Sequence, residues 1–196
     1  MLGLRRKART TTIGRHKKGQ RVRRFTTILA AICAIGGAMR VSAPARADDP
    51  AFLTLGGGYY DVVRRNHDAA EFRAEYWSDY KLWFLHPFVG GMGTSTGSGY
   101  AYAGLRADLF IGRRVVLSGA EAIGAYMRGD GQDLGSILEF RSAVELAYRF
   151  DNRSRLGVAF YHLSNASLGR INPGTEVLSL FYAIPLGPGT PGRGDD

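Results

Sequence analysis

The chain has 196 residues, and 26 Lys and Arg against 17 Asp and Glu give it a formal net charge of +9. The whole excess lies at the start: residues 1–47 hold twelve Lys or Arg and no acid, so residues 48–196 carry a net charge of −3. Because Cys33 is the only cysteine, disulfides, thiolate metal sites and cysteine nucleophiles are excluded from residues 48–196. The basic residues of that part form no stripe among aromatic residues, so we expect no nucleic-acid partner.

Residues 1–47 have the pattern of a secretory signal peptide. A basic region precedes the uncharged run FTTILAAICAIGGAM at 25–39, and small residues follow at Ala45 and Ala47, just before two aspartates. This order predicts cleavage after Ala47, and the apolar run is shorter than the roughly 20 residues of a transmembrane helix. The alternative is a disordered basic arm that binds nucleic acid, but it explains neither the apolar run nor the cleavage pattern.

The next part of the chain, 48–186, alternates between two kinds of side chain. In the run SILEFRSAVELAYRF at 136–150, charged residues such as Glu139 and Arg141 share one parity, and bulky apolar residues such as Phe140 and Val144 share the other. A period of two predicts a β-strand whose faces meet different media. Eight such strands are expected, at 51–60, 70–78, 81–92, 99–111, 114–127, 136–150, 154–165 and 176–186.

The connections between these strands alternate in length. Longer ones are expected around 61–69, 93–98, 128–135 and 166–175, and short ones around 79, at 112–113 and near 151–153. Short turns at one end and long loops at the other are typical of outer-membrane barrels. We therefore predict an all-β fold, an eight-stranded antiparallel outer-membrane β-barrel over 48–186, followed by a flexible C-terminal tail at 187–196. Charged residues such as Arg106 and Asp108 would pair inside such a barrel.

A soluble periplasmic β-sandwich or lipid-binding barrel is the competing structural interpretation. In that case the aromatic parity would form a core and the charged parity would face water. Strand parity alone does not distinguish inside from outside. The unequal loops, together with ten Tyr, ten Phe and two Trp, favour the membrane barrel.

The stretch FYHLSNASLGRINPGTE at 160–176 holds the candidate catalytic residues. His162 and Ser164 lie on one strand face with Cα atoms about 6.5–7 Å apart, and Glu176 enters the neighbouring strand at a similar height. A serine needs a histidine base, and the histidine needs a carboxylate, to attack an ester. Asn165 and Asn172 are candidate donors to an oxyanion. The alternative is a solvated loop at a strand end.

These three residues share the face that is richer in large apolar side chains, which is the lipid side of a membrane barrel. Counting crossings from a periplasmic N-terminus places them at the outer leaflet. A GTSTG motif at 93–97 formally matches a nucleophile elbow, but a strand pattern follows it where a helix is required. The single histidines lack ligand-like partners, so no metal is expected.

The motif HLSNA, followed after a short loop by NPGTE and a final apolar strand, resembles the signature of the PagL-type lipid A 3-O-deacylases. The resemblance implies that His162 is the catalytic histidine, Ser164 the nucleophile and Glu176 the acidic member. It matches Asn172 to an oxyanion-hole residue and Asn165 to the residue after the nucleophile. It further implies an enzyme of the cell outer membrane that needs no cofactor and removes the 3-hydroxyacyl chain at position 3 of lipid A, the membrane anchor of lipopolysaccharide.

The chain departs from this family pattern at two places. Ser167 stands where some members have glycine, and the sequence ends in GPGTPGRGDD, whereas many outer-membrane barrels end on an aromatic residue. Two other functions stay open: a non-enzymatic outer-membrane barrel of structural or adhesin type, and the soluble lipid-binding barrel. Outer-membrane lipid is an expected partner, and a homodimer is left open.

Overall fold

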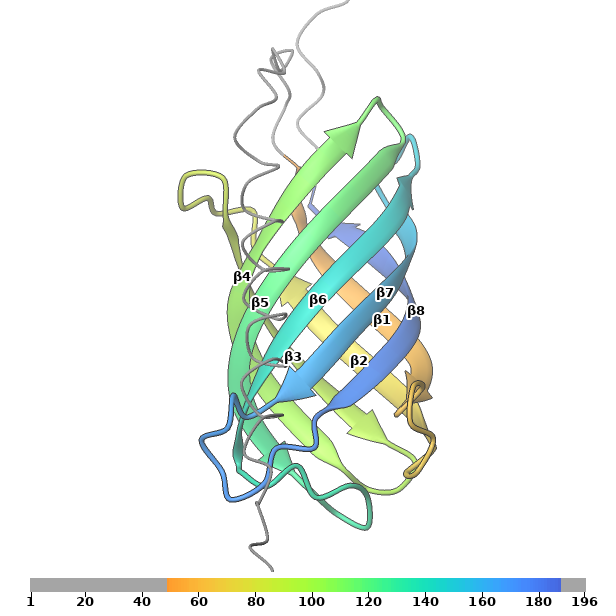
Figure 1. Cartoon of the computed structure of the whole chain (residues 1–196). Coiled ribbons are helices and arrows are strands. Elements are labelled where there is room, and N and C mark those ends of the chain that lie inside the picture. The colour runs from red at the N-terminus through yellow and green to blue at the C-terminus, as the bar shows by residue number, and fades with distance from the viewer. Residues whose placement is uncertain (1–48, 188–196) are drawn as a thin grey trace, which may run out of the picture. The chain divides into compact units, whose positions relative to one another are not determined.

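The computed structural model describes residues 49–187, which form one closed β-barrel. Figure 1 shows the tilted strands in chain order around the barrel. The strands are β1 (Ala51–Tyr60), β2 (Ala69–Trp77), β3 (His86–Thr94), β4 (Gly99–Ile111), β5 (Val115–Met127), β6 (Leu138–Arg149), β7 (Arg155–Ser164) and β8 (Thr175–Leu186). Every neighbouring pair is antiparallel, and β1 pairs with β8 to close the barrel. The predicted eight-stranded antiparallel barrel is confirmed.

Apolar side chains cover the outside of the barrel. Along β7, for example, Leu156, Val158 and Phe160 are exposed, whereas the residues between them are buried. A soluble barrel would bury this large apolar parity, so the soluble alternative is wrong. An outward apolar wall around a polar interior is the arrangement of a transmembrane barrel, which leaves no backbone group unpaired in lipid. Across the described part of the chain, no helix is long and apolar enough to span a membrane.

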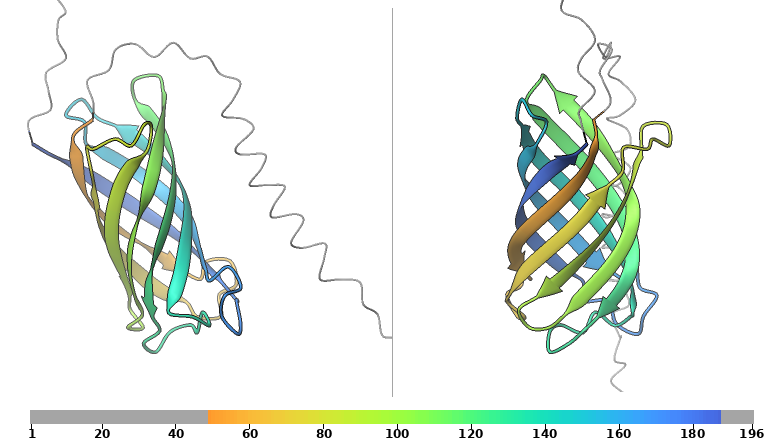
Figure 2. Two further views of the ribbon diagram at one scale, coloured as in Figure 1. Left: turned by 90° about the vertical axis from the view of Figure 1, so that its left-hand side faces the viewer. Right: turned by 180° about the vertical axis from the view of Figure 1, so that it is seen from behind.

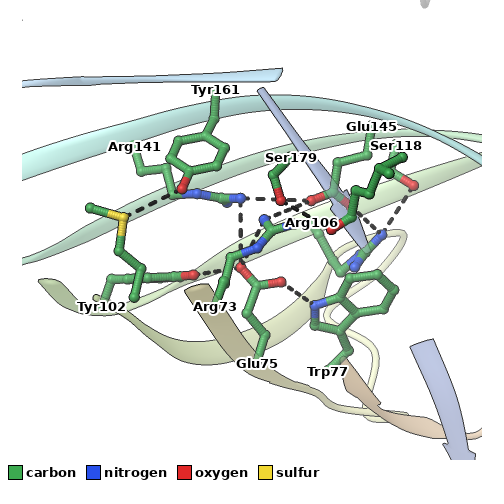
Figure 3. A network of polar contacts seen from close by, with 12 residues as sticks. Arg73, Glu75, Trp77, Tyr102, Arg106, Ser118, Arg141, Glu145, Tyr161 and Ser179 are labelled. Atoms are coloured by element: carbon green, nitrogen blue, oxygen red, sulfur yellow. Dashed lines mark hydrogen bonds and ion pairs between the residues drawn. The ribbon is translucent and has the colours of Figure 1, made fainter. Parts of the chain in front are cut away.

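Charged side chains fill the interior and neutralise one another, as Figure 3 shows. Glu75 lies at the centre: its carboxylate accepts hydrogen bonds from Tyr102 Oη at 2.6 Å and Trp77 Nε1 at 2.8 Å. Guanidinium nitrogens of Arg73 and Arg141 lie 3.4 and 3.5 Å from Glu75 Oε1. The buried charged residues of the strands are Glu71, Arg73, Glu75, Arg106, Glu139, Arg141, Glu145 and Arg155. The interior is therefore a packed ionic core.

Replacing Glu75 by glutamine should lower the free energy of unfolding by about 3–5 kcal/mol, because Arg73 and Arg141 lose a counter-ion that they cannot replace from water. Urea titration of the barrel refolded in detergent micelles measures this. The matched control is Asp151→Asn, which breaks the exposed pair with Arg114 at 2.6 Å. That surface pair should contribute little. Equal midpoints for Glu75→Gln and the wild type would contradict the account of the core.

The third strand begins later than predicted, at His86 instead of residue 81. The apolar run before it folds into a tight turn, in which Leu82 and Leu85 exchange two backbone hydrogen bonds. Trp83 takes a left-handed conformation with φ of 64° at its tip. The connection at 78–85 is consequently long, and the one at 95–98 is short, so the predicted alternation of loop lengths holds only in part.

The two ends of the barrel differ in what they carry. Figures 1 and 2 show the loops between β1 and β2, β5 and β6, and β7 and β8 at one end, and the turn between β4 and β5 at the other. The described chain also enters and leaves at the latter end, where Asp49 forms ion pairs of 2.8 Å with Arg149 and 2.6 Å with Arg155. The predicted signal peptide and C-terminal tail lie outside the described residues, apart from Gly187.

Candidate active site

His162 and Glu176 meet on the outer wall, where β7 pairs with β8. The two residues are direct partners in the strand register, so both side chains leave the sheet on the lipid side. His162 Nδ1 lies 3.1 Å from Glu176 Oε1. The imidazole is 37% exposed and the carboxylate 17%, so the pair is reachable from outside the barrel. A carboxylate on Nδ1 fixes the ring and leaves Nε2 to exchange a proton with another group.

Ser164 ends β7 two residues beyond His162, on the same outward face. Its side chain is partly exposed, and no hydrogen bond within residues 49–187 involves its hydroxyl. His162 and Ser164 thus lie two residues apart on one strand face, with no hydrogen bond formed between their side chains. In enzymes without bound substrate such contacts are often long, and they shorten when substrate binds. Of the three residues that the sequence singled out, the structure places His162 and Glu176 in contact and Ser164 two residues along on the same strand face.

Asn165, directly after the candidate nucleophile, is fully buried and orders the loop at 165–174. Its Nδ2 donates to the backbone carbonyls of Leu134 at 2.7 Å and Ile171 at 2.8 Å. Its Oδ1 accepts the backbone N–H of Ser167 at 3.0 Å. Both amide hydrogens are therefore engaged, which leaves none for a substrate. Ser167 takes a left-handed φ of 66°, a backbone conformation that favours glycine.

Asn172 is placed differently from Asn165. Its Oδ1 accepts the backbone N–H of Asn165 at 3.1 Å, which holds the end of the loop against the end of β7. No other hydrogen bond of the Asn172 side chain is formed within the described residues, so its Nδ2 keeps both hydrogens. Of the two asparagines, Asn172 is the one with donors to spare.

Residues of a second loop, at 128–137, support the site and were not predicted from the sequence. Gln132 donates a hydrogen bond of 3.0 Å to the carbonyl of Gly174, and the Leu134 carbonyl accepts from Asn165. Gln132 and Gly174 are 42 residues apart in the chain, and Leu134 and Asn165 are 31 apart, so no local sequence pattern predicts these contacts. The two loops therefore hold each other above the end of β7.

Gly174 lies against the imidazole. Its φ is +64°, and a Cβ at this position would stand 2.7 Å from His162 Cε1 and 3.2 Å from Nε2. The absence of a side chain is therefore what lets the ring take its place beside the loop. The glycine of the Asn-Pro-Gly sequence is a further residue of the site that the sequence did not single out.

Replacing Gly174 by alanine should reduce the rate of ester hydrolysis by about 10- to 100-fold, because the imidazole must move. The rate on a lipid ester in detergent micelles measures the effect. Gly97→Ala is the matched control, since Gly97 also has a positive φ of 80° but nothing within 4 Å of its Cβ position. Equal rates for the two variants would show that the contact with the imidazole is unimportant.

Comparison with known proteins assigns the family. The family model described as "Lipid A 3-O-deacylase (PagL)" matches residues 65–185, more than half of the chain. Lipid A deacylase PagL of Pseudomonas aeruginosa is 38% identical over 87 residues, which are 44% of this chain. That match spans 48% of the relative, about half of its length.

Two solved structures share the fold. A crystal structure of the outer membrane enzyme PagL superimposes with a TM-score of 0.57 at 23% identity, over 69% of this chain and 99% of the other. A de novo designed transmembrane β-barrel gives 0.51 at 9% identity, over 71% and 98%. An eight-stranded barrel with an apolar outer wall and a charged core is an outer-membrane protein. The chain belongs to the lipid A 3-O-deacylase (PagL) family.

Proposed function

We propose that the protein is a lipid A 3-O-deacylase of the outer membrane, a serine esterase that hydrolyses the ester of the 3-hydroxyacyl chain at position 3 of lipid A. One observation carries the proposal: an imidazole–carboxylate pair faces the lipid, with a serine two residues along on the same strand face. In this pair His162 Nδ1 lies 3.1 Å from Glu176 Oε1. Polar side chains destabilise a barrel on its lipid face. A substrate that is itself a membrane lipid explains their position, and a purely structural barrel does not need them.

The reaction begins when Ser164 Oγ attacks the carbonyl carbon of the ester while His162 Nε2 takes the hydroxyl proton. Glu176 stabilises the imidazolium that forms. Asn172 Nδ2 donates a hydrogen bond to the oxyanion of the tetrahedral intermediate. The backbone N–H of Ala166, which has no partner within the described residues, is a second donor close to Ser164.

The intermediate collapses when its bond to the sugar oxygen breaks, and His162 returns the proton to that oxygen. The acyl chain stays on Ser164 as an ester. Water, deprotonated by the same imidazole, then attacks this ester; the bond between the acyl carbon and Ser164 Oγ breaks, His162 returns the proton to Oγ, and the fatty acid leaves. In this scheme Asn165 acts by ordering the loop, since its amide hydrogens are held by backbone carbonyls. No cofactor enters any step.

Mass spectrometry of lipid A from cells that express the protein tests the proposal. Cells with the wild type should lose one 3-hydroxyacyl group from lipid A, whereas cells with Ser164→Ala should keep it. Heat-modifiable migration on gels confirms that both proteins are folded in the membrane. Unchanged lipid A in cells with folded wild-type protein would favour the non-enzymatic barrel.

A further inference from the structure

The outer wall carries a second carboxylate besides Glu176. Along the eight described strands, the acidic and basic side chains on the outward parity are Glu121, His162 and Glu176; all other strand charges face inward. Glu121 is the middle residue of the 13-residue strand β5, flanked on its outward face by Gly119 and Ile123. A charged group is most unfavourable on a lipid face near the middle of the wall. Glu121 therefore requires an explanation.

Glu121 is hydrogen-bonded to Ser142, an exposed residue of β6. Ser142 Oγ donates to Glu121 Oε2 at 2.7 Å. Within the described residues this is the only hydrogen bond of the Glu121 side chain, and no cation pairs with it. Glu121 Oε1 and the lone pairs of the Ser142 hydroxyl thus face the lipid as open acceptors. We call Glu121 and Ser142 the acceptor pair.

The acceptor pair continues the row of the catalytic residues. In the strand register Glu121 is the partner of Ser142, Ser142 of His162, and His162 of Glu176. Neighbouring strands lie about 4.8 Å apart, so Ser142 is one step and Glu121 two steps, about 10 Å, from His162. Glu176 stands second in β8, at the loop end, and Glu121 stands at mid-strand. The row therefore runs from the rim toward the middle of the membrane.

Apolar side chains surround the acceptor pair on the wall. Leu105 is the partner of Glu121 across β4, and Ile123, Val144 and Phe160 are exposed around it. Headgroups with amines and sugar hydroxyls lie at the rim, whereas acyl chains lie at this depth. A hydrogen-bond donor that reaches an acceptor at this depth is therefore a hydroxyl carried by an acyl chain.

We propose that Glu121 and Ser142 form an acceptor subsite for a hydroxyl group on the acyl chain whose ester is bound at Ser164. The proposal rests on the proposed function, because it needs an ester held beside His162. From the carbonyl at Ser164 the chain runs inward along the wall, and a hydroxyl a few carbons from the ester comes level with Ser142. An acyl chain without a hydroxyl would place hydrocarbon against the open acceptors and leave them unpaired. The transition state for hydrolysis of such an ester is therefore less favourable than that of the hydroxylated ester.

The test compares 4-nitrophenyl dodecanoate with 4-nitrophenyl 3-hydroxydodecanoate as substrates of the purified barrel in detergent micelles. The wild type should prefer the hydroxylated ester by about 10- to 100-fold in kcat/KM, the contribution of one hydrogen bond to a carboxylate. Glu121→Leu should bring this ratio close to one, and Ser142→Ala should lower it. Val144→Ala, the next outward residue of β6, should keep the wild-type ratio.

The outcomes separate the subsite from the proposed function. A wild-type ratio of one, or a ratio that survives Glu121→Leu, would overturn the subsite while hydrolysis itself still supports the esterase. Hydrolysis of neither ester, with lipid A also left intact, would overturn the esterase and the subsite together. Ser142→Ala removes only a surface hydroxyl, so it gives an answer even if Glu121→Leu fails to assemble.

Discussion

Replacing Ser164 by alanine should lower the rate of lipid A deacylation by at least about a thousandfold, because no other hydroxyl takes the place of the nucleophile. His162→Ala should cost about as much, since the serine hydroxyl is a weak nucleophile without its base. The double variant should be no slower than either single one, because the residues act as a unit. Release of fatty acid from lipid A by purified protein in micelles measures all three rates.

The folded state of each variant is the necessary control for this series. Ser164 makes no side-chain hydrogen bond within residues 49–187, so its replacement should leave urea stability unchanged. A Ser164→Ala protein that keeps both its stability and more than a tenth of the wild-type rate would exclude Ser164 as the nucleophile.

Glu176→Gln should reduce kcat by about 10⁴-fold, the size of loss found for the carboxylate of such triads. The amide keeps the shape of the side chain but removes the charge that stabilises the imidazolium at 3.1 Å. It also presents an N–H that can hold His162 Nδ1 as an acceptor, which puts the ring proton on Nε2, where the base is needed. Initial rates on lipid A at saturating substrate measure the loss.

Glu176→Asp provides the conservative comparison. It restores the charge but draws the carboxylate back by one methylene group, so it should recover part of the rate lost in Glu176→Gln. Equal rates for the aspartate and glutamine variants would show that the charge of residue 176 is not what matters.

Most of the barrel follows from the period-two alternation. In β6 the charged or small parity and the bulky parity are so distinct that the strand and its two faces can be assigned from the sequence. The start of β3 cannot be assigned in this way, because the run before it, Leu82–Leu85, is apolar throughout and shows no change of pattern where the strand begins. There the left-handed backbone of Trp83 forms a turn without the glycine or asparagine that usually signals one.

The candidate site was predictable where it depends on strand faces and one hairpin. The alternation of strand faces, together with the hairpin between the last two strands, places His162, Ser164 and Glu176 on the lipid side from the sequence alone. The part played by Asn165 was not predictable, because its partner Leu134 comes from another loop. The sequence alone shows that Glu121 lies on the outward parity. Its place in one row with Ser142 and His162 depends on the strand register, which the sequence does not give.

Tandem mass spectrometry of pure lipid A after incubation with the purified barrel tests the central claim most directly, since it locates the ester that is cleaved. The account predicts loss of the acyl chain from position 3 with the wild type and intact lipid A with Ser164→Ala. Loss of a chain from another position, or the same loss with Ser164→Ala, would contradict it.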